Sequence, residues 1–244
     1  MSTSERPSRG QFPMSTSEGP GRDDRARILR NALAVGAATG AYGISFGAVG
    51  VAGGLSVLQT CALSVLLFSG GSQFALVGVL GAGGSALAAV AAALLLGVRN
   101  ALYGLRLAPL LRLRWPSRLV GAQLTIDEST AMAMGQDSPA LARLAFWSTG
   151  LSVFVLWNLA TLLGALGAHA FGDPRALGLD AAIPAAFVAL LWPRLTHRGP
   201  WLVALGAGLL ALALTPVAPP GVPVLVAALV AVPAGLRARR EATP

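Results

Sequence analysis

Long apolar stretches separated by short polar clusters dominate this chain. Residues 31–98 contain no Asp, Glu, Lys or Arg, and apolar runs return at 144–170, 199–215 and 221–236. A helix needs roughly 20 apolar residues to cross the hydrocarbon core of a bilayer, whereas a surface helix of a soluble domain keeps a charged face. The pattern therefore predicts an all-α polytopic membrane protein.

Two of the apolar segments are interrupted by polar residues. In segment 56–80 the interruption is Ser-Gly-Gly-Ser-Gln at 69–73, and in segment 119–136 it is Thr-Ile-Asp-Glu-Ser at 125–129. A helix can break at membrane depth only where the freed backbone groups face protein or a wet cavity. We therefore expect both segments to be broken or re-entrant, entering and leaving on one side.

The arginines indicate which helix ends face the cytoplasm. The 18 basic residues are all Arg, and most of them cluster near 22–30, 106–118, 194–198 and 237–240. Such clusters remain on the cytoplasmic side, so an even number of crossings separates one cluster from the next. This predicts about six full transmembrane helices plus the two broken segments, with both termini cytoplasmic. Because each half holds one broken segment, an inverted repeat is expected.

The composition limits the remaining functions. Only 11% of residues are charged, too few to cover a water-facing surface, and the net charge of +8 has no polar fold on which to form a nucleic-acid-binding face. We expect a transport domain at 28–236, a Pro/Gly/Ser-rich disordered tail at 1–27 and a short tail at 237–244. No nucleophile, nucleotide or metal motif is evident, so neither an enzyme nor a cofactor is expected.

The first candidate site is the interruption at 69–73. Gly70 and Gly71 permit a helix break, and a half-helix beginning near Ser72 would direct its N-terminal amides towards the gap, with Gln73 beside it. A helix N-terminus favours a carboxylate. The alternative is a glycine packing notch in which Gln73 bonds to a neighbouring helix.

Arginine, amide and phenol side chains follow in the next apolar run. Arg99 and Tyr103 are four residues apart, on one side of a helix, with Asn100 on the neighbouring face. A guanidinium at this depth can hold a carboxylate through two parallel hydrogen bonds. The alternative for Arg99 is an extended side chain that reaches the lipid headgroups.

Acidic residues complete the candidate set. Asp127 and Glu128 lie in a segment that is otherwise uncharged from 119 to 136, where they could bind an ammonium group, relay protons or pair with Arg99. If this segment lies at the membrane surface, both are ordinary solvated acids. Asp180 precedes Pro184 by four residues, where it would cap a helix or contribute to an outer gate.

The same stretches resemble the AzlC family of bacterial membrane proteins, the large subunits of branched-chain amino acid exporters. The similarity covers about residues 28–236 and is carried by short motifs in a fixed order: GAYGISFGAVG, SGGSQFALVG, VRNALYG with LRLAP, TIDESTAM and GLDAAIPAAFVALLWP. Relatives often carry His where this chain has Asn100. A titrating imidazole is therefore absent at that position.

The resemblance implies export of valine, leucine or isoleucine across the bacterial inner membrane, together with a small membrane subunit of the AzlD type. The mechanism expected is alternating access around a pocket lined by the 69–73 break, Arg99 and Asp127 or Glu128, with proton coupling through the acids. Two alternatives remain open at this point. The chain could be a channel or permease for another small solute, or an accessory membrane subunit.

Overall fold

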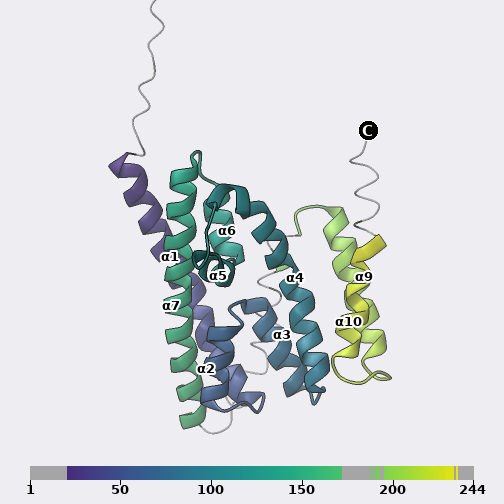
Figure 1. Ribbon diagram of the computed structural model, residues 1–244. Coiled ribbons are helices and arrows are strands. Elements are labelled where there is room, and N and C mark those ends of the chain that lie inside the picture. The colour runs from purple at the N-terminus through teal and green to yellow at the C-terminus, as the bar shows by residue number, and fades with distance from the viewer. Residues whose placement is uncertain (1–20, 172–187, 189–190, 193–194, 234, 236–244) are drawn as a thin grey trace, which may run out of the picture.

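The computed structural model describes residues 21–171, 188, 191–192, 195–233 and 235, and its regular elements within this part of the chain are all helices (Figure 1). The expected all-α class is confirmed. Most of the N-terminal tail and the whole of 237–244 lie outside the described residues. The helices are α1 (Arg22–Ala52), α2 (Val57–Leu66), α3 (Gly70–Gly81), α4 (Ala86–Leu111), α5 (Ser117–Gln123), α6 (Asp127–Met134), α7 (Pro139–Phe171), α9 (Arg198–Leu214) and α10 (Val222–Ala228).

Three of the described helices, α1, α4 and α7, are long and apolar enough to cross a membrane. Helices α2, α3, α9 and α10 are apolar but shorter than the roughly 20 residues that a full crossing needs. The expected span at 177–192 falls almost entirely outside the described residues. The total of about six crossings therefore stays a prediction.

Helices α1 and α7 form a long pair along one side of the bundle and run in the same direction (Figure 1). One face of α1 carries glycines at positions 36, 40, 43 and 47. In this order they contact residues 152, 156, 157 and 161 of α7, which shows that the two helices are parallel. A Cβ placed on Gly40 would lie 2.9 Å from Leu156 Cβ, and one on Gly43 would lie 2.6 Å from the Trp157 carbonyl oxygen. Because glycine has no side chain, the two backbones can approach closely. In a membrane, where water supplies no hydrophobic driving force between helices, the resulting van der Waals contacts stabilise the pair.

The α2–α3 segment is a helical hairpin, a shape consistent with the re-entrant segment that the sequence predicts. Its two ends are adjacent, because a Cβ on Gly81 would lie 3.4 Å from Gly53 Cα at the end of α1. The break between the helices covers residues 67–69, and α3 begins at Gly70. The break therefore lies about two residues earlier than expected, with the glycines opening the second half-helix rather than forming the gap.

The α5–α6 segment is a second hairpin and enters from the opposite end of the bundle (Figure 1). Arg143 Nε, near the start of α7, donates to the Leu110 carbonyl at the end of α4 at 3.3 Å. The chain therefore leaves and returns at the same end, with its break at 124–126. The prediction that 119–136 does not cross agrees with this geometry.

Helices α9 and α10 pack together beside α4 (Figure 1). The turn that joins them lies against the α3–α4 turn, where a Cβ on Gly84 would approach the Pro220 carbonyl oxygen to 2.9 Å. Arg198 thus starts α9 at the end of the bundle that carries the arginines following α4. This matches the orientation that the arginine clusters predict for this pair of helices.

The first helix begins earlier than expected. Residues 22–27, assigned from composition to the disordered tail, form the first turns of α1. Asp23 and Asp24 lie in the first turn, where negative charge is favourable, and Arg27 pairs with Asp24 at 2.9 Å. The helix therefore includes the last six residues of the predicted tail, and the first-turn acids support this extension beyond its apolar part.

Candidate functional site

The two hairpins, α1, α4 and α7 enclose a cavity of about 230 Å³. The hairpins reach it from opposite ends, so both helix breaks contribute to its wall. Of the residues predicted from the sequence, the cavity brings together Gly70, Gly71, Arg99, Asn100, Asp127 and Glu128. The remaining wall consists of Ala38, Thr39, Tyr42, Phe68, Ser69, Phe74, Ile126, Val153 and Trp157.

The N-terminus of α3 opens onto this cavity. Its N-cap residue is Ser69, and the first backbone bond of the helix runs from the Gln73 amide to the Ser69 carbonyl at 2.9 Å. The amides of Gly70 and Gly71 precede that bond, and the Ser69 side chain does not cap them. Both residues line the cavity, and free amides at a helix N-terminus favour an anion.

An ion pair between α4 and α6 lies beside the start of α3. Arg99 Nη2 lies 2.9 Å from Asp127 Oδ2, and each side chain is 26% exposed. Tyr103 Oη donates to Asp127 Oδ1 at 2.7 Å, so Tyr103 supports the carboxylate and is not itself part of the cavity wall. A Cβ on Gly71 would lie 3.1 Å from Arg99 Nη2, which shows that the guanidinium abuts the start of α3.

Three buried polar atoms of the cavity residues lack a hydrogen-bond partner among the described residues. They are the Ser69 hydroxyl, Arg99 Nε and Asn100 Oδ1. Ser69 is only 6% exposed. Buried polar groups are normally satisfied, so these three atoms are available to hydrogen-bond a ligand in the cavity. Four further atoms of this kind, on Thr130, Thr149, Ser152 and Asn158, lie outside the cavity wall.

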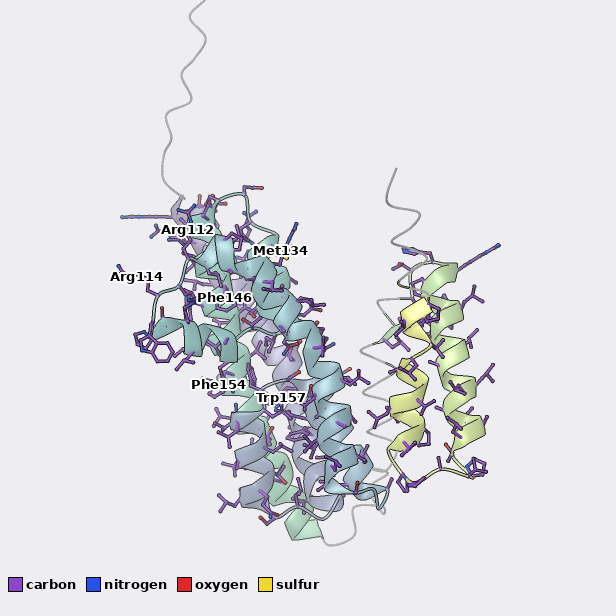
Figure 2. All side chains as sticks on the ribbon, turned by 45° about the vertical axis from the view of Figure 1, so that its right-hand side comes forward. Arg112, Arg114, Met134, Phe146, Phe154 and Trp157 are labelled. Carbon is purple, nitrogen blue, oxygen red and sulfur yellow. The ribbon has the colours of Figure 1, made fainter. Side chains whose placement is uncertain are left out.

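Aromatic side chains form the apolar part of the wall. Trp157 stacks near Phe46 and meets Phe74 edge to face, with ring centroids 6.4 Å apart for the second pair. Figure 2 shows Trp157 toward the middle of the bundle, away from Arg112 and Arg114 at one end. A Cβ on Gly70 would lie 3.1 Å from the Trp157 ring, so the start of α3 packs directly against this ring.

Ser72 and Gln73, which were expected to bind substrate, do not line the cavity. Both are fully buried, and Ser72 Oγ donates to the Ala93 carbonyl of α4 at 2.8 Å. Gln73 Nε2 donates to the carbonyls of Ser64 and Leu67, and Gln73 Oε1 accepts from Trp157 Nε1 at 3.0 Å. The alternative weighed for Gln73, a bond to a neighbouring helix, describes its position.

We expect Gln73→Met to destabilise the protein by about 2–4 kcal/mol, since the carbonyls at the end of α2 and the Trp157 N–H would lose their partner while buried. The substitution keeps the side-chain length, so the loss reports on hydrogen bonds. Thermal unfolding of the purified protein in detergent would measure it. An unchanged midpoint would show that water replaces the amide.

Hydroxyl groups stabilise the second break. Thr125 Oγ1 donates to the Gly121 carbonyl at 2.7 Å, and Ser129 Oγ donates to the Leu124 carbonyl at 2.6 Å. Ser129 also accepts from the Ile126 amide at 3.1 Å. Sequence reasoning missed these roles, although hydroxyl residues on either side of an acidic pair in apolar chain are a usable signal for a satisfied break.

Two more residues, one predicted from the sequence and one not, complete the comparison with the sequence. Asp180, the predicted cap or outer gate, lies outside the described residues. Trp157 was not predicted, because a tryptophan in an apolar run carries no local sign that it faces a site. Only the packing of α1 against α7 places its ring beneath the α3 N-terminus.

Comparison with known families identifies this architecture with one family. The family model described as AzlC protein matches residues 34–171, which include both hairpins and all of the cavity wall. Neither the curated proteins nor the solved structures contain a match to the chain. The matched region covers more than half of the sequence and ends with α7.

Proposed function

The chain belongs to the AzlC family, and from this premise we propose that it exports branched-chain amino acids across the bacterial inner membrane by alternating access. The family and the apolar helices support a role in membrane transport. The substrate, the outward direction and the mechanism are proposed from the chemistry of the cavity. A small AzlD-type membrane subunit is the proposed partner.

The observation that carries the proposal is the arrangement of unpartnered and charged groups around the cavity. The start of α3, the Ser69 hydroxyl and Arg99 together suit a carboxylate. The Glu128 carboxylate and Asn100 Oδ1 in the same wall suit an ammonium group. A zwitterion can use both sets of groups at once.

The cavity also limits the size and polarity of the substrate. Its volume of about 230 Å³ is below the roughly 300 Å³ at which pockets for drug-sized ligands begin. Phe68, Phe74 and Trp157 supply an apolar surface beside the polar groups. A small amino acid with an aliphatic side chain fits this combination, whereas a polar side chain would lose its hydration without gaining partners.

The arrangement of the two hairpins supports alternating access. Each break forms one part of the cavity wall, and each hairpin reaches it from a different end of the bundle. Movement of one hairpin relative to α1 and α7 would open the cavity to one side of the membrane while the other hairpin keeps it closed. Protonation of an acidic wall residue is the proposed means of coupling to the proton gradient.

The direct test is counterflow of labelled leucine in proteoliposomes that contain the chain together with its small partner. We expect saturable exchange that valine and isoleucine inhibit. Leucinol, which lacks the carboxylate, and the 2-oxo analogue of leucine, which lacks the ammonium group, should not compete. Transport without saturation would indicate a channel, and activity of the partner alone would reduce this chain to an accessory role.

We expect Glu128→Gln to raise the KM for leucine about tenfold, because the substrate ammonium would lose a charged partner in a largely desolvated site. Leucine counterflow at a series of concentrations measures this change. Asp137→Asn is the matched control, since Asp137 is exposed between α6 and α7 and is not part of the wall. Equal KM values for both variants would remove Glu128 from substrate binding.

A further inference from the structure

Helix α2 ends at the break before α3, with Val65 and Leu66 exposed on the surface of the bundle, and its last carbonyl groups need partners. The final backbone bond of the helix runs from the Leu67 amide to the Leu63 carbonyl at 2.9 Å. The carbonyls of residues 64–67 lie beyond the reach of the α2 ladder. An uncapped helix end at this depth would be costly, because no bulk water is available to replace the missing donors.

Two glutamines from different hairpins satisfy these carbonyls. Gln73 of α3 donates to Ser64 at 3.2 Å and to Leu67 at 2.8 Å, which closes the α2–α3 hairpin on itself. Gln123, the last residue of α5, donates through Nε2 to the Val65 carbonyl at 2.7 Å and more weakly to the Leu66 carbonyl at 3.5 Å. The second hairpin therefore caps a helix of the first.

Gln123 is held firmly in this position. The next residue, Leu124, is 2% exposed and packs against α7, where a Cβ on Gly150 would lie 3.0 Å from Leu124 Cβ. Four residues after Gln123 comes Asp127, which pairs with Arg99 in the cavity wall. One short segment thus contacts the end of α2, the middle of α7 and the ion pair.

We propose that Gln123 is a positioning residue for substrate binding, which ties the α5–α6 hairpin to the end of α2 and holds the two halves of the cavity wall together. This inference rests on the proposed function for its effect on transport. The end of α2 leads within three residues to Ser69 and the start of α3. Loss of the tie would therefore displace the carboxylate side of the cavity relative to Asp127 and Glu128.

The test uses variants that separate hydrogen bonding from packing. Gln123→Met keeps the length of the side chain but has no donor, whereas Gln123→Lys keeps a donor and suits a helix C-terminus. Gln136→Met is the matched control, because Gln136 Nε2 caps its own helix through the Met132 carbonyl at 2.9 Å and joins no second hairpin.

Hydrogen exchange of the full chain in lipid nanodiscs is measured for the amides of residues 67–72, together with leucine counterflow. We expect Gln123→Met to exchange at least about tenfold faster in this segment and to raise the leucine KM by a similar factor, with Gln123→Lys and Gln136→Met close to the wild type. Equal exchange in Gln123→Met and the wild type, or equal acceleration in Gln123→Met and Gln123→Lys, would overturn the proposal.

The two readouts distinguish this proposal from the proposed function. Exchange at 67–72 reports on the tie whatever the substrate is. If the wild type fails to exchange leucine while Gln123→Met still accelerates amide exchange, the tie stands and the substrate assignment fails. If leucine exchange proceeds normally in both proteins, Gln123 has no positioning role.

Discussion

Arg99→Ala is expected to lower leucine efflux at least about tenfold, the largest functional effect among single substitutions in the cavity. Arg99 Nη2 pairs with Asp127 Oδ2 at 2.9 Å and lies at the start of α3. Its removal leaves the Asp127 carboxylate without its cation in a partly buried site and deletes the only positive side chain of the cavity wall among the described residues. Efflux of leucine from preloaded cells, normalised to the amount of protein in the membrane, measures the change.

Two further variants make this result specific. Arg106→Ala removes an exposed arginine from the same helix and should leave efflux close to the wild type. Arg99→Lys keeps the charge but loses the planar fork, so we expect activity between those of the wild type and Arg99→Ala. If Arg99→Ala transports as well as Arg106→Ala, the Arg99–Asp127 ion pair is not needed for transport.

Gly47→Ala is expected to cause the largest loss of stability, about 3 kcal/mol or more. A Cβ at this position would collide with the Thr161 carbonyl, and a neighbouring contact to the Ala165 amide is only 2.7 Å. Both atoms belong to the α7 backbone, so no side-chain rotation can relieve the overlap. The helices must separate along the whole contact, which lowers the yield of monodisperse protein in detergent and its thermal midpoint.

Gly167→Ala provides the matched control for that measurement. Gly167 lies in α7, and a Cβ there would meet no atom of the described structure within 4 Å. Alanine favours a helix over glycine by about 1 kcal/mol, so this variant should be as stable as the wild type or slightly more so. Equal stability of Gly47→Ala and Gly167→Ala would contradict the close backbone packing of α1 on α7.

Much of this architecture is evident in the pattern of the chain. The uncharged stretch at 31–98 indicates a membrane, and the glycines and polar residues at 69–73 indicate a break in that segment, which the structure places at 67–69. The arginine clusters require that the broken segments return to the side from which they start. Each of these inferences depends on the cost of placing a polar or charged group in the bilayer. That cost is set by the residue type and does not depend on which other residues pack around it.

The roles of individual polar residues could not be read in the same way. Gln73 and Arg99 both look like ligand-binding groups within an apolar run, yet Gln73 is fully buried in hydrogen bonds to α2 and α7, while Arg99 lines the cavity. The difference lies in the direction of each side chain relative to helices distant in sequence. Periodicity cannot supply that direction when every face of a helix is apolar.

The sequence by itself determined that this chain is a helical membrane protein with two broken segments, because the bilayer imposes the same demand on every backbone polar group. The tertiary structure decided which residues meet at those breaks, that α1 and α7 bring Trp157 beneath the start of α3, and that Gln123 caps a helix of the other hairpin. These contacts join segments tens of residues apart. Their geometry depends on close packing and hydrogen bonding between whole helices, which no local pattern encodes.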